Sequence, residues 1–380
     1  MRRIAIISVF LALLVSCAET KVQDNSISVI PEPMYCRADE GVFVIDKDTK
    51  IVVDDLSEEM QRIAGFLNEK LSKAAGFELE IVKDGPMPRE NFIAFMNAGL
   101  QSESYEINVV PQHILVDYGD GAGAFYALQT LFQLLPVEIF SQELQKRVDW
   151  TVPCCNIDDK PRFKYRGMHL DVCLHYFDLE FLKKYIDIMA AHKVNRFHWH
   201  LTEDQGWRLE IKKYPLLTEK GQWRKETVVG SLSSGVYDGI PHGGYYTQEQ
   251  VKELVKYAAD RYVTIIPEIE LPGHALAAIA CYPELSCGLE DHYETATRWG
   301  IFKQVYCPKE STFEFLEDVF DEVFELFPSE LIHIGGDECP KASWKACPDC
   351  QALIRKLGLK DEYELQSYFV TRMEKYINSK

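Results

Sequence analysis

Positive charge is scarce in this sequence of 380 residues. It has 41 Lys and Arg against 59 Asp and Glu, which gives a formal net charge of −18. Because nucleic acids and anionic membrane surfaces attract basic proteins, this balance argues against both as partners and favours neutral or cationic ligands.

No short internal repeat is evident either. The remaining composition, 47% hydrophobic and 26% charged, is that of an ordinary globular protein long enough for two domains.

A long apolar run is also missing. The apolar run at 4–15 is too short for an ordinary membrane span, but it follows two arginines and leads into Cys17. This pattern is typical of an export signal and resembles the lipobox of bacterial lipoproteins, whose Cys becomes the lipidated N-terminus. We expect a signal peptide at 1–17, a lipid anchor at Cys17, a polar tether at 18–27 and a location in the cell envelope, in the periplasm or at the outer membrane. A plain secretory signal is the alternative.

The cysteines lack the spacing of a small disulfide-bonded domain. Ten of the eleven lie beyond Cys17, and export permits disulfides. Cys339, Cys347 and Cys350 lie close together, and the last two form a Cys-x-x-Cys pair. These three form a disulfide, a metal site or neither. Because no Cys or His follows Cys350, buried thiols or one local disulfide are favoured over a metal, and we expect no cofactor.

Residues 28–158 are expected to form a smaller α+β domain. Runs typical of strands alternate here with two stretches of helical spacing, and such a succession favours helices packed on a sheet. No motif for chemistry stands out, so we interpret this region as a support domain. The expected strands are at 42–45, 50–53, 80–82, 92–95, 105–109 and 113–116, and the expected helices at 58–75 and 124–135.

Residues 159–380 change to alternating strands and helices. Regular alternation of this kind predicts a parallel sheet, either open or closed into a barrel. The expected strands are at 167–172, 195–202, 263–269 and 331–334, and the expected helices at 179–192, 247–261, 311–327, 345–357 and 361–378.

Acidic residues and one histidine follow three successive strands of this second region. The strand at 195–202 leads into Glu203, the next leads towards His274, and the last leads into Asp337 and Glu338. Parallel α/β folds assemble their active sites at the carboxyl ends of their strands. A solvated loop face would also be acidic, but it would not need a His after a Pro-Gly turn. We therefore expect a catalytic site here.

The adjacent carboxylates Asp337 and Glu338 suggest a division of roles. On an extended backbone, neighbouring side chains point to opposite sides. One carboxyl group then stays ionised while the other is kept protonated in an apolar pocket. An acid-catalysed hydrolysis with charge stabilisation requires this combination.

Four motifs in the second region resemble those of family-20 glycoside hydrolases, the β-N-acetylhexosaminidases. Four motifs in the same order are a specific signal, and the resemblance covers both expected domains. It implies an α+β domain followed by a (β/α)8 TIM barrel. It also implies a glycan substrate with terminal N-acetylglucosamine or N-acetylgalactosamine. The motifs are RGMHLD at 166–171, FHWHLTEDQGWR at 197–208, PEIELPGH at 267–274 and HIGGDE at 333–338.

The resemblance implies a substrate-assisted, retaining mechanism, one of the exceptions to the two-carboxylate scheme. The 2-acetamido oxygen of the sugar is then the nucleophile. Glu338 corresponds to the general acid and base, and Asp337 to the group that orients the acetamido N–H. His274 and Glu203 correspond to a hydrogen-bonded pair behind the acid, with Glu203 in place of the usual Asp. The alternative for Glu203 is an ion pair with Arg208.

Two departures from the family pattern stand out. The family has an Arg on the first barrel strand that holds the hydroxyl groups of the sugar, and this chain has Leu174 there. Leu cannot make a charge-assisted bidentate hydrogen bond. The sequence ends at Lys380, after about four strand–helix units, so we expect a barrel truncated within its catalytic domain and an activity in doubt.

Two other functions remain open. One is an inactive glycan-binding lipoprotein or remnant. The other is a metal-dependent hydrolase similar to barrel amidohydrolases. It ranks lower because its metal-binding pair on the first strand is absent. Its expected ligands are His198, His200, His274 and Asp337.

Overall fold

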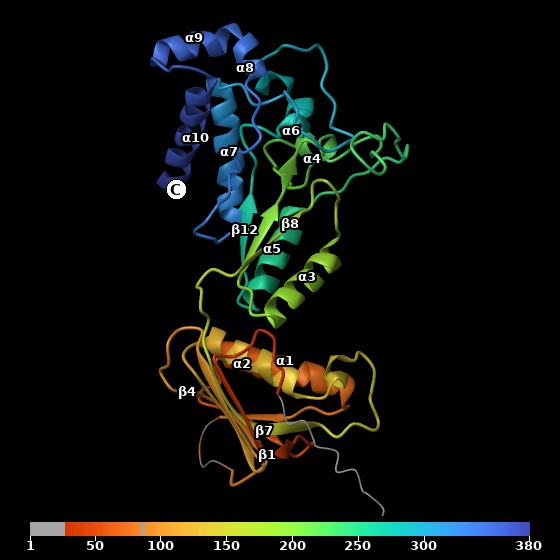
Figure 1. Ribbon diagram of the computed structural model, residues 1–380, viewed down its shortest axis with the longest axis vertical. Helices are drawn as coiled ribbons and strands as arrows, with labels where there is room; N and C mark the ends of the chain where they lie inside the picture. Colours follow the sequence, from red (N-terminus) through yellow and green to blue (C-terminus); the bar gives the residue numbers. More distant parts are fainter. Residues whose placement is uncertain (1–26, 84, 86–87) are drawn as a thin grey trace, which may run out of the picture.

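The structure of the protein is a computed structural model that describes residues 27–83, 85 and 88–380 (Figure 1). The expected signal peptide, Cys17 and all but the last residue of the expected tether lie outside the described residues. Among the described residues, no helix combines the length and the apolar character that a bilayer crossing requires.

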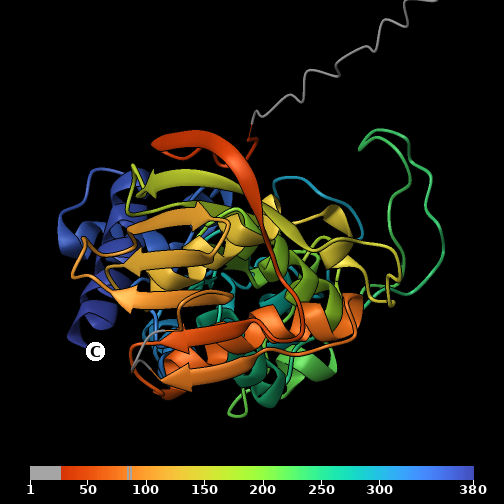
Figure 2. The same cartoon turned by 90° about the horizontal axis from the view of Figure 1, so that it is seen from below.

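The first part of the chain, red to yellow in Figure 1, is a seven-stranded mixed sheet with two helices. Its strands lie side by side in the order β1-β7-β5-β6-β4-β2-β3 (Figure 2). Both helices lie between this sheet and the second part of the chain (Figure 1). The expected α+β character is confirmed. The bounds are β1 (Tyr35–Val44), β2 (Lys50–Val53), α1 (Glu58–Ala74), β3 (Glu80–Lys83), β4 (Phe92–Asn97), β5 (Tyr105–Val110), β6 (His113–Tyr118), α2 (Gly121–Leu134), the 3-10 turn η1 (Val137–Phe140) and β7 (Thr151–Asp159).

Strand β7 was missing from the sequence-based expectation. It pairs antiparallel with β1 on one side and with β5 on the other, so it is a central strand of the sheet. Its run contains Pro153, which is uncommon inside strands, and the adjacent Cys154 and Cys155 break the apolar–polar alternation. The expected domain boundary at residue 158 falls one residue before β7 ends.

Helix starts follow local capping chemistry. The side chain of Ser57 accepts a hydrogen bond from the amide of Met60 at the start of α1, and Asp120 does the same for Gly123 in α2. In the second part, Thr247 and Gln250 form a complete capping box at the start of the helix that follows residue 247. These caps satisfy amide groups that have no partner within the helix.

One buried ion pair and one partly buried ion pair join the two parts of the chain. Lys193 Nζ donates to Asp159 Oδ2 at 2.9 Å and to Tyr105 Oη at 2.6 Å. The Arg166 guanidinium donates to both carboxylate oxygens of Glu103, at 3.0 and 3.1 Å. Such paired, hydrogen-bonded charges fix relative orientation, because breaking one would leave its partner buried and uncompensated.

The second part is a parallel sheet with helices against one face. Its three strands lie in the order β12-β9-β8. The bounds are β8 (Gly167–Asp171), α3 (Leu179–Ala191), β9 (Arg196–His200), β10 (Thr202–Glu203), β11 (Gly206–Trp207), α4 (Leu216–Glu219), α5 (Gln248–Ala259), β12 (Thr264–Glu268), α6 (Leu276–Cys281), the 3-10 turn η2 (Pro283–Leu285), α7 (Glu310–Leu326), α8 (Ala342–Ala346), α9 (Pro348–Leu357) and α10 (Glu362–Ser379).

The segment 331–334 continues this sheet with only one bridged residue. His333 pairs in parallel with Glu268 of β12, and the expected four-residue strand is otherwise absent. Backbone hydrogen bonds nevertheless run between the two segments: the His333 amide donates to Pro267, and the Leu271 amide donates to Ile334. The segment therefore occupies the position of a fourth parallel strand and delivers the residues that follow it to the same edge.

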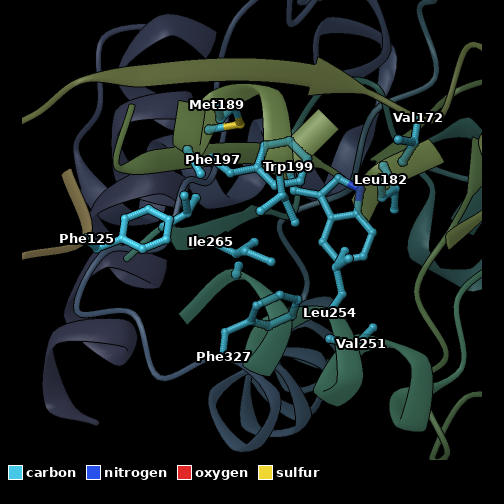
Figure 3. Packing of buried hydrophobic residues seen from close by; sticks show 14 of the residues in the cluster. Phe125, Val172, Leu182, Met189, Phe197, Trp199, Val251, Leu254, Ile265 and Phe327 are labelled. Carbon is cyan, nitrogen blue, oxygen red and sulfur yellow. The ribbon is translucent and has the colours of Figure 1, made fainter. Parts of the chain in front are cut away.

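Alternating residues give β9 two different faces. Phe197 and Trp199 are fully buried and point to the helical side, where side chains from α3, α5 and β12 surround them (Figure 3). His198 and His200 point to the opposite face, because successive side chains of a strand alternate. The apolar face holds the sheet on its helices, and the other face carries polar groups towards the site.

The cysteines group differently from the sequence-based expectation. All ten described cysteines are free thiols. The sulfurs of Cys347 and Cys350 group with those of Cys287 and Cys307, which come from the long segment after α6, whereas Cys339 packs at the edge of the same apolar cluster. Sequence distance alone suggested Cys339, but the chain folds back from much farther away.

Candidate active site

The carboxyl ends of the parallel strands surround a cavity of about 350 Å³. All four residues expected to be catalytic line it, so the structure brings them together as the strand order predicted. The lining residues are His169, Asp171, His198, His200, Glu203, Glu268, Glu270, His274, His333, Gly335, Asp337 and Glu338.

His274 is held by two carboxyl groups. Its Nδ1 lies 2.8 Å from Glu203 Oε1 and 3.0 Å from Asp204 Oδ2. Burial opposes the charged ring, but hydrogen bonds to Asp204 and Glu203 raise the pKa of His274 to about 11. The ring is therefore an imidazolium at neutral pH.

Asp204 is the partner that the sequence analysis missed. Its side chain is fully buried, and Oδ1 accepts a hydrogen bond from the Leu276 amide at 2.9 Å. Glu203 Oε2 instead accepts from the Asp204 amide at 2.6 Å. Burial raises the pKa of both carboxyl groups. The alternative of an ion pair between Glu203 and Arg208 is wrong, because the Arg208 guanidinium donates to backbone carbonyl groups.

Glu338 lies on the other side of the His274 ring. His274 Nε2 is 3.5 Å from Glu338 Oε2, and the Glu338 side chain is 49% exposed. Both residues have positive φ angles, 49° for His274 and 40° for Glu338. Such angles are rare for residues with side chains and gather at functional sites. The backbone therefore adopts an unfavourable conformation at His274 and at Glu338, the two positions that bring the ring and the carboxylate together.

The expectation of an extended backbone at Asp337 and Glu338 is wrong. Gly335 and Gly336 have φ angles of 60° and 108°, so the chain turns before the two acids. Both side chains are exposed to solvent, and no apolar pocket surrounds either one within the described part of the chain. The two acids differ in their neighbours: Glu338 faces His274, and the negative charge of Asp337 acts on Glu270 and His333.

Glu268 forms a second centre at the floor of the cavity. Its Oε2 lies 2.6 Å from both His198 Nε2 and His200 Nδ1, and its Oε1 lies 2.8 Å from His333 Nδ1. Burial opposes ionisation, but hydrogen bonds from these three rings hold the pKa of Glu268 far below its usual range. One carboxylate thereby links β9, β12 and the segment 331–334, and the sequence analysis did not identify it.

Glu270 supports the turn that presents the acids. Its Oε1 accepts a hydrogen bond from the Gly336 amide at 2.8 Å. A Cβ atom at Gly335 would approach Glu270 Oε2 to 1.7 Å, so only glycine fits. Burial, together with the charges of Glu268 and Asp337, raises the pKa of Glu270 to about 9. The group is therefore protonated at neutral pH and adds no charge beside the two acids.

We expect the substitution Glu270→Gln to stabilise the protein progressively as the pH rises. The folded pKa of Glu270 lies above its ordinary value of 4.5. Folded protein keeps a proton there that unfolded chain releases, so wild-type stability falls between those two pH values. The slope is at most about 1.4 kcal/mol per pH unit. Gln keeps the acceptor for Gly336 and does not titrate. Urea unfolding should show that the free energy of unfolding of Glu270→Gln, relative to that of wild type, is larger at pH 8 than at pH 5. For Glu106→Gln, whose side chain is exposed, the difference from wild type should be the same at both pH values. Equal pH dependence of wild type and Glu270→Gln would contradict the prediction.

The four expected metal ligands do not converge. His198 and His200 share Glu268, whereas His274 faces Glu203 and Asp204. Other sets at the cavity do place donor atoms within 4.8 Å of one another, such as His200 with Glu268 and Glu270. In that set His200 and Glu268 already satisfy one another through a hydrogen bond of 2.6 Å, and His198 shares the same carboxylate oxygen. The geometry is that of a hydrogen-bonded acid–base network.

Leu174 stands where the resemblance implies an arginine. It is 42% exposed, and its carbonyl group accepts a hydrogen bond from Arg224 Nη2 at 2.8 Å. Arg224 and Arg208 are both buried and donate mainly to backbone carbonyl groups, three of which belong to residues 172–174 directly after β8. Neither guanidinium is free to take over the contact with a sugar.

Parallel strands alternate with helices in this fold, and carboxyl groups and a charged imidazole lie at the strand ends. Barrel enzymes that carry out acid–base chemistry have this arrangement. Residues 163–380 match the glycosyl hydrolase family 20 catalytic domain, and residues 26–160 match domain 2 of the same family. The chain belongs to glycosyl hydrolase family 20. This confirms the resemblance and the fold class, a TIM-barrel type preceded by a smaller domain.

Relatives with known names agree with this assignment. The chain is 46% identical to a beta-hexosaminidase of Porphyromonas gingivalis over 93% of this chain and 44% of that protein, and 34% identical to one of Vibrio furnissii over 93% and 56%. The chain spans about half the length of these curated relatives.

Solved structures also match. An exo beta-N-acetylglucosaminidase of Vibrio harveyi, in complex with N-acetylglucosamine, matches with a TM-score of 0.78 and 34% identity over 92% of this chain and 53% of that one. A beta-N-acetylhexosaminidase of Bacteroides fragilis matches with 0.75 and 35% over 92% and 64%.

Proposed function

We propose that the protein hydrolyses terminal, non-reducing β-linked N-acetylhexosamine residues of glycans by substrate-assisted, retaining catalysis. The observation that carries the proposal is the pairing of Glu338 with the His274 imidazolium at 3.5 Å, next to Asp337, at the carboxyl ends of the strands. The complex of the Vibrio harveyi relative with N-acetylglucosamine supports the class of substrate.

In the proposed first step, the 2-acetamido oxygen attacks the anomeric carbon while Glu338 gives its proton to the departing oxygen. The glycosidic bond breaks and an oxazolinium-type intermediate forms. Asp337 accepts a hydrogen bond from the acetamido N–H and balances the positive charge that develops there. In the second step, Glu338 takes a proton from water, whose oxygen attacks the same carbon and opens the ring. Two inversions retain the configuration.

His274 acts in this scheme as a positioning residue. Its Nε2–H faces Glu338, and its Nδ1 is held by Asp204 and Glu203. The Nε2–H of the ring can donate a hydrogen bond to Glu338 and hold its carboxyl group where both proton transfers take place. The buried Asp204 fixes the orientation of the ring.

The acetamido group of the substrate provides the test of this proposal. We expect release of nitrophenol from 4-nitrophenyl N-acetyl-β-glucosaminide to exceed release from the β-glucoside by at least about 10³-fold, because the glucoside lacks the internal nucleophile. The two rates should be measured as kcat/KM on the same preparation. Similar rates on both substrates would contradict substrate assistance. No turnover together with calorimetric binding of N-acetylglucosamine oligomers would support the inactive glycan-binding alternative, which the hydrolase relatives do not favour.

We also propose that Cys17 carries a lipid anchor and places the protein in the cell envelope. Support comes from the basic, apolar and Ser-Cys succession at 1–17. Labelling with a palmitate analogue in the native host should mark the wild type and not Cys17→Ser. A labelled Cys17→Ser variant would contradict the anchor.

A further inference from the structure

Four cysteines from two distant segments meet away from the active site. Cys287 and Cys307 lie on the irregular segment between α6 and α7, whereas Cys347 and Cys350 flank the start of α9. Their four sulfur atoms all lie within 4.8 Å of one another. Three of the residues are buried, and Cys287 is half-buried. We refer to these four residues as the cysteine quartet.

The sulfur spacing within the quartet fits a tetrahedral metal centre. Cys350 Sγ is 3.6 Å from Cys307 Sγ and 3.8 Å from Cys287 Sγ. Four thiolates that each lie about 2.3 Å from a Zn²⁺ ion at the centre of a tetrahedron are about 3.8 Å apart. A disulfide needs about 2.05 Å and joins two sulfurs only. The nearly equal distances from Cys350 to two different sulfurs match a shared centre better than a pair.

The sequence and the charges around the quartet favour cysteines in the thiolate form. Cys347 and Cys350 have the Cys-x-x-Cys spacing of zinc ligands, with Pro348 between them at the first position of α9. Cys347 directly precedes this ten-residue helix and Cys350 lies in its first turn, so both lie at the positive end of the helix dipole, which favours thiolates. Lys309 is held next to Cys307 by a hydrogen bond from its Nζ to the Ser286 carbonyl group at 2.8 Å. A positive charge there offsets part of the charge of four thiolates.

The surroundings of the quartet are mostly apolar, and only Cys287, at its edge, also lines a cavity of about 240 Å³. Val305, Trp344 and Ile354 pack around it together with Leu365. Trp344 Nε1 donates to the Tyr306 carbonyl group at 3.0 Å, which ties α8 to the segment that carries Cys307. An apolar shell of this kind limits the access of water, which would compete for the metal and exchange the ligands.

The quartet connects the two loops that supply the active site. The segment with Cys287 and Cys307 follows His274 in the chain, and the Tyr306 amide donates to the Pro272 carbonyl group. The segment with Cys347 and Cys350 follows Glu338. Gly273 lies against the backbone of Asp337 and Cys339, so the two loops touch again beside the acids. A link at the quartet fixes the spacing between His274 and Glu338.

We propose that Cys287, Cys307, Cys347 and Cys350 bind one structural Zn²⁺ ion that clamps the two active-site loops together. Each thiol releases its proton to solvent on binding, so four thiolates and Zn²⁺ form a centre with a net charge of −2. Tetrahedral sulfur sites favour zinc among the divalent metals, and a closed four-ligand site leaves no position for substrate. The ion therefore has a structural role, and the hydrolysis runs through Glu338 and Asp337.

Metal content and thiol state of the purified protein test the proposal. Elemental analysis should find one zinc per chain in wild type and in Cys339→Ser, and background zinc in Cys350→Ser. Cys339 is the matched control, because it lies on the same segment and outside the quartet. Titration of wild type with an organic mercurial, followed by a zinc-sensitive dye, should release that zinc as four thiols react. This second measurement does not depend on the folding of any variant.

Three outcomes would overturn the proposal. One is a mass under non-reducing conditions that is lower by four hydrogens, with no zinc, which would mean two disulfides. Another is one iron per chain in place of zinc. The last is zinc that remains in Cys350→Ser at the wild-type level. These three outcomes concern metal content and thiol state, whereas the proposed hydrolase activity is measured by turnover of the N-acetylglucosaminide. Each of the two proposals can therefore be contradicted without the other.

Discussion

Replacement of Glu338 by Gln should lower kcat/KM for an N-acetylglucosaminide with a poor leaving group by about 10² to 10⁴-fold. Gln keeps the size of the side chain but cannot give a proton to the departing oxygen. Because Glu338 is half exposed and Gln has nearly the same size, the change leaves no buried gap. The fold should therefore persist, and thermal unfolding should show a Tm close to that of the wild type.

The size of the loss should depend on the leaving group. A dinitrophenolate departs without a proton, so Glu338→Gln should slow the first step much less with that substrate than with an alkyl glycoside. Loss of the general base in the second step should be relieved by azide, which attacks without giving up a proton. The product should be the β-glycosyl azide, with retained configuration.

Glu330→Gln is a suitable control for these measurements. Glu330 is exposed just before the segment 331–334 and does not line the cavity. It should leave kcat/KM unchanged. Equal losses with both leaving groups for Glu338→Gln, or no rescue by azide, would assign the proton transfer to another group.

The positions of the acids could be predicted from the sequence because strand order alone determines them. Three strands of one parallel sheet end at the same edge, so residues just after them meet whatever the loops do. Glu203, His274, Asp337 and Glu338 do line one cavity. Their roles in hydrolysis stay predictions that the variants have to test.

The partners of these residues could not be predicted, because they depend on side-chain direction across strands. Asp204 and Glu203 are adjacent, and only the fold shows that both reach His274. Glu268 gains its three histidines from a neighbouring strand and from the segment 331–334. The same limit explains the cysteines: Cys287 and Cys350 are 63 positions apart, yet their sulfurs lie 3.8 Å apart.

Strand β7 and the turn at Gly335 show a different limit. Periodicity identifies strands that have one apolar face, but β7 has a neighbour on each side in its sheet and mixes Cys, Asn and Pro. Extended backbone was assumed at Asp337 because a strand precedes it. Two glycines with positive φ then redirect the chain, and Glu270 occupies the space that any larger residue at Gly335 would need.

Asp337→Asn should lower kcat for the N-acetylglucosaminide by about 10² to 10³-fold, the cost of removing one group that stabilises charge in the transition state. The reason differs from that for Glu338. Asn still accepts a hydrogen bond from the acetamido N–H, but it no longer balances the positive charge that spreads onto the acetamido group as its oxygen attacks.

This difference separates the two acids experimentally. Asp337→Asn should slow substrates with good and poor leaving groups alike, because the acetamido oxygen attacks as the leaving group departs in both, and azide should not rescue it. Exposed Asp149→Asn, just before β7 in the first part of the chain, is the matched control and should have wild-type kcat. If the loss in Asp337→Asn instead follows the leaving group, Asp337 serves the departing oxygen and the assignment of the two acids is reversed. The two neighbouring acids therefore differ in a way that kinetics can measure. The effect of Glu338→Gln depends on the bond that breaks, and the effect of Asp337→Asn depends on the bond that forms.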